Sequence, residues 1–499
     1  MSATTGQSLK RGFKSAIRYL QGWWGTDMES ATSSGMAAPA YDLNVLPRAE
    51  HSISRKRISP AAVRVLYGLR EAGFQAHLVG GAVRDLLLGG DPKDWDVATD
   101  ARPEQIRQTF RQCRLIGRRF VIAHVRFGHE IIEVTTFRGL GAGLPAHEEP
   151  DREVEAEGLI LRDNVFGSIE EDALRRDFTV NALYYSIDDF AVRDFAGGLP
   201  DLEARVLRLI GDPELRYRED PVRMLRAARL AAKLEFTLAP ETLAPIGRMA
   251  ALLDGIPPAR LFDDLQKLFL YGHAEKSFDQ LLNLRLWEHL FPTVPMDRAT
   301  GRPRDEALIR AALRSTDSRI AENKPVTPAF LFAAFLWAPF VDAAYGRGNS
   351  GVGEGEPEDE EALGIAAETV FQRAVQRIAL PRRFSIVTRE IWEMQSRLET
   401  NSPGRGRRLL RHPRFRAAYD FLCLRAQVDA ELEPLASRWE QAQQVAPEDF
   451  DALFKLANSG GKPKAKVNPA NADGAKPAAA KRRRRRRRSG TPAAPAPIE

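Results

Sequence analysis

The chain lacks several features that would place it in a class at once. Only 2 of its 499 residues are cysteine, and Cys113 and Cys423 form no CxxC or zinc-ligand spacing. This excludes a disulfide scaffold and suits a reducing cytoplasm, which is the location we predict. The longest apolar stretch, Ala329 to Val341, contains Pro339 and is shorter than the ~18 residues that a membrane span requires. We predict a buried core helix there and no stable membrane insertion.

Positive charge is concentrated near one end of the chain. The formal net charge is +6, but residues 461–488 alone carry +11, which leaves −5 on the remainder. The densest run is Lys481, Arg482, Arg483, Arg484, Arg485, Arg486, Arg487 and Arg488. Because like charges and few apolar residues cannot offset chain entropy, we predict a disordered polybasic tail over 446–499. It would bind the phosphates of polyanions without sequence preference. A tail that serves only solubility is the alternative.

A glycine pair marks a turn that can face an anion. Gly80 and Gly81 follow the apolar run Ala76–Val79, a predicted strand, and precede Ala82–Leu88, a predicted helix. Backbone N–H groups at such a turn can bind the phosphates of a nucleoside triphosphate.

Two aspartates follow a short distance downstream. Asp94 and Asp96 flank Trp95 in a second extended run, where alternation turns both carboxylates to one face. Two such oxygen ligands can hold Mg²⁺, and nucleotidyl transfer through two metals needs a carboxylate bridge of this kind. The alternative is a solvated turn over Asp91–Asp96, with Pro92 as its breaker.

Five motifs in chain order carry a resemblance to a known family. They are LVGGAVRD (78–85), DWD (94–96), EVTTFR (133–138), RRDFTVNA (175–182) and REDPVRMLR (218–226). With them the chain resembles the class II tRNA nucleotidyltransferase and bacterial poly(A) polymerase family, of the polymerase-β-like superfamily, from about residue 54 to about residue 435. The run Leu115–Val125 is more similar to the poly(A) polymerase branch than to the CCA-adding branch.

The resemblance implies an activity. It is the template-independent addition of adenylate from ATP to RNA 3′ ends, a polyadenylation that promotes RNA decay, with two Mg²⁺ ions as cofactors. RNA 3′ ends and ATP are the implied partners, with RNA-decay proteins as further candidates, and the basic tail would retain RNA between additions. CCA addition to tRNA stays open because the family motifs separate the two reactions poorly. A non-catalytic RNA-binding adaptor is the alternative of another class, and the joint presence of Asp94, Asp96 and the glycine pair argues against it.

The resemblance also implies site residues. Asp94 and Asp96 are the metal ligands, and Asp177 is preferred to Glu133 as a third catalytic carboxylate. Glu133 lies on an apolar strand, where an ionised side chain is costly unless it is paired or bound to a metal; a pair with Arg138 or Arg126 is the open alternative. The nucleotide-binding set is Gly80, Gly81, Arg84, Arg138, Arg176, Glu219, Asp220, Arg223 and Arg226, of which Glu219, Asp220 and Arg223 are assigned to the incoming base. An exposed, salt-bridged helix face is the alternative for 223–229.

The alternation of elements predicts an α+β fold, with a small mixed-sheet nucleotidyltransferase head followed by an all-α neck and body. The predicted parts are a flexible extension (1–52) with a basic amphipathic helix at 9–24, a catalytic head (53–201), a nucleotide- and RNA-binding neck (202–272), a body and RNA-binding region (273–445) with an acidic flexible insert (346–361), and the disordered tail (446–499). A capping box at Ser168 and Glu171 predicts a helix through Ala182. Single helices are predicted over 240–253 and 411–433.

Overall fold

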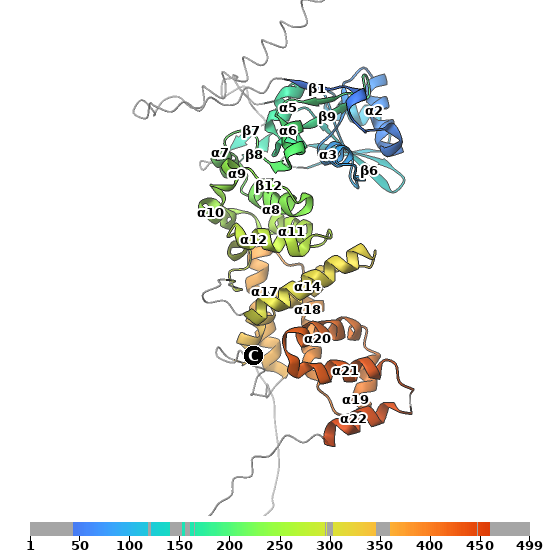
Figure 1. Ribbon diagram of the computed structural model, residues 1–499, viewed down its shortest axis with the longest axis vertical. Helices are drawn as coiled ribbons and strands as arrows, with labels where there is room; N and C mark the ends of the chain where they lie inside the picture. The colour runs from blue at the N-terminus through green and yellow to red at the C-terminus, as the bar shows by residue number, and fades with distance from the viewer. Residues whose placement is uncertain are drawn as a thin grey trace, which may run out of the picture.

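The computed structural model describes residues 43–117, 121–139, 152–154, 160–163, 165–294, 296, 303–345, 360–446 and 448–459. The predicted helix at 9–24, the insert up to residue 359 and the tail beyond residue 459 lie outside these ranges. Figure 1 shows a sheet-containing head at one end and helices that lead away from it to the other end. The predicted α+β class, a mixed-sheet head followed by helices, is confirmed.

An eight-stranded mixed sheet forms the head, in the order β1-β10-β9-β2-β3-β6-β5-β4. Its strands are β1 (Asn44–Leu46), β10 (Val192–Asp194), β9 (Leu183–Ser186), β2 (Ala76–Val79), β3 (Asp96–Thr99), β6 (Glu130–Thr136), β5 (Ile122–Phe127) and β4 (Cys113–Ile116). The β3–β6 pair is parallel, with Asp96 opposite Glu133. The β2–β3 pair is antiparallel, with Val79 opposite Asp96. The end of β2, the start of β3 and Glu133 therefore meet at one place in the sheet.

The described part of the head contains five α-helices, and capping residues mark the starts of α2 and α5. They are α2 (Pro60–Glu71), α3 (Gly81–Leu87), α4 (Pro103–Thr109), α5 (Ile169–Arg175) and α6 (Gly198–Ala204), with two 3₁₀ turns, η1 (Arg48–Glu50) and η2 (Arg55–Arg57), near the start. The side chain of Ser59 caps α2 by accepting from the backbone N–H groups of Ala61 and Ala62, and Pro60 occupies the first helical position. The apolar face of α2, with Val65 and Leu69 fully buried, covers the central strands.

Two details of the head differ from the sequence-based prediction. Residues 44–46 pair with 192–194 and add an edge strand, so the sheet begins inside the segment predicted as an N-terminal extension. The helix predicted from Ser168 to Ala182 starts at its capping box but ends at Arg175. Residues 179–181 then form a 3₁₀ turn, η3. The carboxylate of Asp177 accepts from the Phe178 N–H, and this local bond competes with continuation of the helix.

Helices account for most of the remaining described chain. They are α7 (Pro213–Glu219), α8 (Val222–Leu234), α9 (Pro240–Leu243), α10 (Ile246–Met249), η4 (Ala250–Gly255), α11 (Pro258–Phe269), α12 (Ala274–Asn283), α13 (Trp287–Leu290), α14 (Pro303–Ala321), α15 (Pro328–Phe335), α16 (Trp337–Tyr345), α17 (Glu360–Ile378), α18 (Arg382–Leu398), α19 (Pro403–Leu410), α20 (Phe415–Val428), η5 (Ala430–Leu432), α21 (Glu433–Ala442) and α22 (Phe450–Ser459). Two short sheets pair β11 (Val206–Leu207) with β12 (Thr237–Leu238) and β7 (Arg152–Val154) with β8 (Ile160–Asp163).

Three helix predictions need correction. The single helix predicted over 240–253 is divided into α9, α10 and η4, with Pro245, which has no backbone N–H, between the first two. The helix predicted over 411–433 is shorter, because α20 begins only after Pro413 and ends at Val428. Glu360 and Glu361, assigned to the acidic insert, begin α17.

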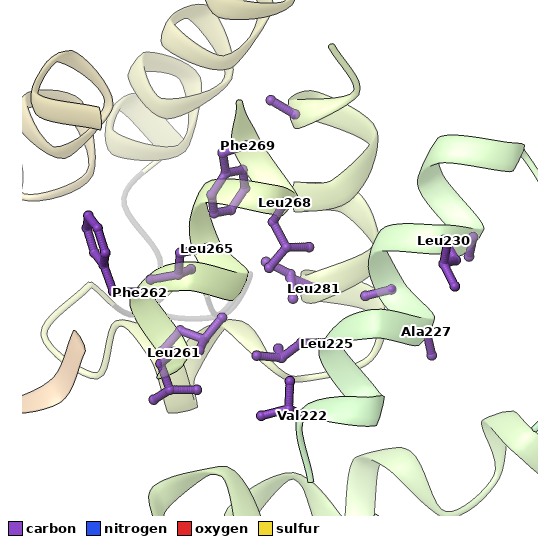
Figure 2. Packing of buried hydrophobic residues seen from close by; sticks show 14 of the residues in the cluster. Val222, Leu225, Ala227, Leu230, Leu261, Phe262, Leu265, Leu268, Phe269 and Leu281 are labelled. Atoms are coloured by element: carbon purple, nitrogen blue, oxygen red, sulfur yellow. The ribbon is translucent and has the colours of Figure 1, made fainter. Parts of the chain in front are cut away.

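The neck is held together by an apolar seam between α8, α11 and α12. Figure 2 shows Leu268 on α11 beside Leu281 on α12, with Leu225 of α8 facing them, and Leu261 and Leu265 of α11 belong to the same buried cluster. Each is at most 2% exposed. Full burial of a leucine side chain contributes about 1.5–3 kcal/mol, so this seam holds α8 firmly beside α11.

The apolar stretch predicted as a buried core helix forms α15 and the start of α16. Phe332 and Phe335 are 4% and 1% exposed, and Phe335 packs edge-on against Trp287 with ring centroids 5.5 Å apart. Within the described ranges no single helix has the length and apolar character to cross a membrane, and α15 and α16 meet that test only as a pair bent by 51°.

Candidate active site

A glycine keeps a space open between an acid and an arginine at the centre of the sheet. Gly80 follows β2 with φ of +73°, a conformation that side chains with a Cβ rarely adopt. A Cβ there would lie 3.5 Å from Asp96 Oδ2 and 3.6 Å from Arg176 Nη1. Glycine therefore supplies the turn and leaves room between the carboxylate and the guanidinium.

The two aspartates sit at the start of β3. Trp95 is 7% exposed in the core, whereas Asp94 is exposed and Asp96 is half-buried. The strand itself begins only at Asp96, so Asp94 lies in the bend before it rather than in an extended run. Burial, with the charges of Glu133 and Asp94, raises the pKa of Asp96 to about 6, although Arg176 lowers it. Asp96 is therefore in a locally negative environment.

The donor set at Asp96 fits a divalent cation. Carboxylate oxygens are the ligands that Mg²⁺ prefers, and a cation would relieve the repulsion that raises the Asp96 pKa. In the part of the chain that the structure describes, no group of three or more His, Cys, Asp or Glu side chains is arranged as a complete ligand set. Mg²⁺ usually binds through one or two carboxylates together with water and substrate phosphates, which is what this arrangement offers.

Glu133 lies opposite Asp96, and its contact differs from the ion pair that was left open as the alternative for it. Its side chain is 49% exposed and its Oε1 lies 3.5 Å from Nε2 of His124 on β5, instead of pairing with Arg138 or Arg126. The strand register brings the Glu133 carboxylate to the side of the sheet where Asp96 lies.

Asp177 is engaged elsewhere. Nε of Arg226 donates to Asp177 Oδ2 at 2.7 Å, and Nη2 of Arg226 donates to the same oxygen. Oδ1 of Asp177 accepts from the Phe178 N–H at 2.8 Å and from Asn181 Nδ2 at 3.3 Å. Burial raises the pKa of Asp177, but the charge of Arg226 and these hydrogen bonds outweigh it and hold that pKa well below its usual range. Asp177 thus joins the head to α8, and the carboxylates that raise the Asp96 pKa are Glu133 and Asp94.

Asp172 is a buried carboxylate that the sequence analysis did not assign to the site. It orients two arginines of the predicted nucleotide-binding set, Arg176 and Arg138. Asp172 is 1% exposed, and its Oδ2 accepts from Arg176 Nη2 at 3.0 Å and from the Tyr184 hydroxyl at 2.6 Å. Its Oδ1 accepts from the Arg138 N–H at 3.1 Å and lies 3.6 Å from Arg138 Nε. Nε of Arg176 donates to the Tyr184 hydroxyl at 2.8 Å. The signal in the sequence was the four-residue spacing of Asp172 and Arg176.

Arg84 is used inside the fold. It is 3% exposed; its Nη1 donates to Asn181 Oδ1 at 2.5 Å, and its Nε and Nη2 donate to Asp85. Lys233 on α8 lies 3.1 Å from the other oxygen of Asp85. These bonds tie α3 to η3 and to α8, and the nucleotide contact of Arg84 stays a prediction.

The three residues predicted to face the incoming base gather at the α7–α8 junction. Nη1 of Arg223 donates to Glu219 Oε2 at 2.9 Å, and Arg216 donates to the same oxygen at 2.8 Å. Arg216 also donates to two backbone carbonyl oxygens at the end of α5, which joins this corner to the head. Asp220 pairs with Arg260 of α11 at 2.7 Å.

Known proteins are similar to this chain along most of its length. The Poly(A) polymerase I of Salmonella typhi is 48% identical over 432 residues, which cover 85% of this chain and 91% of that protein. The chain belongs to the bacterial poly(A) polymerase family. The Poly(A) polymerase I of Haemophilus influenzae is 45% identical over 418 residues, 83% of this chain and 91% of that protein. The family resemblance found in the motifs is confirmed.

Family models match three successive parts of the chain. Residues 76–208 match the Poly A polymerase head domain, residues 235–296 match the probable RNA and SrmB-binding site of polymerase A, and residues 354–489 match the polymerase A arginine-rich C-terminus. The head-domain match contains the predicted site residues from Gly80 to Asp177, whereas those from Glu219 to Arg226 fall between the first two matches.

Similarity to CCA-adding enzymes covers less of the chain. The CCA-adding enzyme of Lactobacillus johnsonii is 37% identical over 230 residues, 46% of this chain and 55% of that protein. Among solved structures, a tRNA-processing enzyme (apo form I) matches with a TM-score of 0.55 at 20% identity, over 82% of this chain and 99% of that one. The Bacillus stearothermophilus CCA-adding enzyme in complex with CTP matches with a TM-score of 0.50 at 23% identity, over 81% and 94%. These structures show a shared fold.

Proposed function

We propose that this protein adds adenylate residues from ATP to RNA 3′ ends without a template. The observation that carries the proposal is the match, at 45–48% identity, to about nine-tenths of the length of relatives named Poly(A) polymerase I. In the reaction a bond forms between the RNA 3′ oxygen and the α-phosphorus of ATP, while the bond from that phosphorus to pyrophosphate breaks. No covalent enzyme intermediate is needed.

Arg176 is the residue best placed to contact the triphosphate. Its Nε and Nη2 are held by Tyr184 and Asp172, while Nη1 faces the space that Gly80 keeps open. A guanidinium fixed in this way loses little side-chain entropy when it binds a phosphate, and its hydrogen bonds to the anion are charge-assisted. We include Arg138 in the same contact because Asp172 holds it too.

Asp94 and Asp96 would hold Mg²⁺, two ions in the full proposal. When bound, Mg²⁺ neutralises charge that develops on the attacking and leaving oxygens. We propose Glu133 in place of Asp177 as the third carboxylate, supported by its position opposite Asp96 and by the engagement of Asp177 with Arg226.

Alanine substitutions at Glu133 and at Asp177 separate a catalytic role from a structural one. Glu133→Ala is expected to lower kcat at saturating Mg²⁺ by about tenfold or more. Its stability should change little, because Glu133 is half exposed. Asp177→Ala is expected to lower the free energy of unfolding by about 2 kcal/mol or more, since it leaves Arg226 without its acid. If neither change slows turnover, the assignment of a third carboxylate is wrong; if only Asp177→Ala does so while still folded, Asp177 is restored to that role.

Supplying nucleotides one at a time tests the activity. With generic RNA, Mg²⁺ and ATP alone, the purified enzyme is expected to produce a long ladder of products on a denaturing gel. CTP, UTP and GTP serve as matched controls and should support far less extension. An enzyme that stops after C, C and A on tRNA would instead be a CCA-adding enzyme, and one that adds nothing would be an adaptor.

Deleting residues 460–499 tests the polybasic tail. The shortened enzyme is expected to add nucleotides but to bind RNA about tenfold more weakly at 50 mM salt, with the difference shrinking as salt rises. A full-length variant with glutamine at each of positions 482–488 is the matched control for chain length and should behave like the deletion. Equal RNA affinity at all salt concentrations would refute a role of the tail in binding.

We further propose that the enzyme acts in the cytoplasm and that RNA-decay proteins act on the tails it adds. A single-stranded adenylate tail lacks base pairs and gives proteins that bind single strands an accessible 3′ end. Loss of the enzyme in cells is therefore expected to lengthen the half-lives of RNAs that carry such tails, and unchanged half-lives would contradict this part.

A further inference from the structure

One face of the strands β6, β5 and β4 carries exposed side chains. The opposite face of these strands lies in the core, where α2 and α4 pack on it. The buried side chains on that core face are Ala123, Val125, Ile132 and Val134. Because side chains alternate across a strand, the residues between them point to the other face. There Ile116 and Ile131 are 41% and 48% exposed. We call this side of β6, β5 and β4 the open face.

A row of polar side chains crosses the open face and leads to the proposed metal ligands. Asp96 of β3 lies opposite Glu133 of β6. On the next two strands, His124 of β5 lies opposite Glu133, and Arg114 of β4 lies opposite His124. Residues opposite each other on paired strands share a face, and Nε2 of His124 is 3.5 Å from Oε1 of Glu133. The row therefore runs from two acids near the centre of the sheet to a cation at its edge.

Arg114 is the cation at the outer end of this row. It is exposed, and within the described ranges it has neither an ion pair nor a side-chain hydrogen bond. Its strand, β4, is the last of the sheet. Because neighbouring strands lie about 4.8 Å apart, the backbone of Arg114 is about 10 Å from that of Glu133. A guanidinium that no carboxylate neutralises is suited to bind a phosphate.

The direction of attack separates the two substrates across Asp96. In phosphoryl-type transfer the attacking and leaving oxygens lie roughly in line, on opposite sides of the phosphorus. The triphosphate is proposed beside Gly80 and Arg176, which lie at β2 and its neighbour β9. The strand on the other side of β3 is β6. The RNA 3′ oxygen would therefore approach from the side of β6, where the open face begins.

We propose that the open face binds the last nucleotides of the RNA that is being extended, with Arg114 bound to a phosphate of the RNA backbone. This inference rests on the proposed function. The charges fit this direction, since the 3′ oxygen would lie at the acids and their metal while the phosphates before it pass toward the cation. Nucleotides stacked about 3.4 Å apart cover the roughly 10 Å from Glu133 to Arg114 within the last few of the strand.

The open face offers contacts that do not depend on base identity. Ile131 precedes Glu133 by two residues on β6, and Ile116 follows Arg114 by two on β4, so the two isoleucines flank the row on opposite sides. Their exposed surface can pack against bases, and a phosphate contact carries no sequence information. The open face would thus accept any RNA end, as addition without a template requires.

Neutral phosphates test the contact in the full-length enzyme. RNAs that carry one uncharged methylphosphonate, at each of the last three phosphates in turn, are extended by a single AMP at varied RNA and varied ATP. For the wild-type enzyme, one of these replacements is expected to raise the KM for RNA about tenfold and to leave the KM for ATP unchanged. Arg114→Gln should raise the KM for unmodified RNA to a similar extent. The same replacement should then have no further effect, because the contact is already lost.

Arg107→Gln is the matched control. Arg107 is exposed on α4, which packs against the core face of the same strands, so its variant removes an equal charge from the other side of the sheet. It should keep the wild-type KM for RNA and the wild-type response to each neutral phosphate. The proposal is overturned if Arg114→Gln also keeps that KM, or if every neutral phosphate affects it as much as wild type.

Binding of the same RNAs without nucleotide distinguishes this proposal from the proposed function. Loss of one phosphate contact should lower the slope of log affinity against log salt by about one for Arg114→Gln, and Arg107→Gln should keep the wild-type slope. A wild-type enzyme that adds no adenylate would refute the proposed function, while these affinities would still test the open face. Equal slopes for wild type and Arg114→Gln would refute the phosphate contact even in an active enzyme.

Discussion

Replacing Asp94 and Asp96 together by alanine is expected to lower the rate of adenylate transfer by on the order of 10³-fold or more. The two carboxylates are the proposed ligands of Mg²⁺, and their removal leaves no acid at the start of β3 to hold the ion beside the space that Gly80 keeps open. Incorporation of AMP into RNA in a single turnover, at saturating Mg²⁺ and ATP, measures the effect. An undiminished rate would remove the basis of the proposed enzymatic function.

Asp96→Asn shows whether such a loss comes from unfolding. The pKa of Asp96 is raised from 3.8 to about 6 by burial and by Glu133 and Asp94. Because the folded pKa lies above the unfolded one, ionisation of Asp96 lowers stability as the pH rises between these values. In EDTA at pH 7 the asparagine variant should therefore be more stable, by up to about 2 kcal/mol, and the difference should vanish below about pH 4. Denaturant titration at both pH values provides the measurement, and lower stability at pH 7 would contradict it.

Replacing Asp172 by alanine is expected to be the most destabilising single change at the site, by about 3–5 kcal/mol. It removes one buried carboxylate that holds Arg176, Arg138 and the Tyr184 hydroxyl, and it leaves two guanidiniums without their acid. Equilibrium unfolding in denaturant measures the loss. Asp189→Ala is the matched control: Asp189 also pairs with an arginine four residues away, but it is 47% exposed, so its loss should cost at most about 1 kcal/mol.

Asp172→Asn separates orientation from folding. The amide keeps the shape of the carboxylate but can no longer accept with both oxygens, so Arg176 should lose its fixed position while the core stays packed. We expect the KM for ATP to rise about tenfold, with a smaller change in kcat. If the KM for ATP and the stability both match wild type, Asp172 does not position the arginines.

The proposed site lies across the junction of head and neck, and bonds between the two parts hold it together. Asp177 of the head pairs with Arg226 of α8, and Lys233 of α8 pairs with Asp85 of α3. Arg216 of α7 donates to backbone carbonyl oxygens at the end of α5. The phosphate end of a nucleotide would contact the head and its base would contact the neck, so substitutions that loosen this junction should affect nucleotide binding without contacting the nucleotide.

Local patterns were sufficient for β2, α3 and β3 and for the place of Gly80 and Asp96, whereas Asp94 lies in the bend before β3. Their signals, an apolar run followed by two glycines and acids spaced by two around a tryptophan, depend on residues that are neighbours in the chain. The helix predicted through Ala182 failed because Asp177 accepts a backbone bond just beyond Arg175, a competition that periodicity does not register.

Tertiary structure alone decided which charges meet. Asp177 pairs with Arg226, which lies 49 residues further along the chain. Asp220, at the end of α7, pairs with Arg260 of α11. Glu133 lies opposite Asp96 because β3 and β6 pair in parallel. Motif order singled out all of these acids and preferred Asp177 to Glu133 as the third catalytic carboxylate. In the fold, Glu133 lies opposite Asp96 and Asp177 pairs with Arg226. The physical reason is range: backbone conformation follows from adjacent side chains, whereas the partner of an ionised group is whichever opposite charge the packing of distant elements brings within a few ångströms.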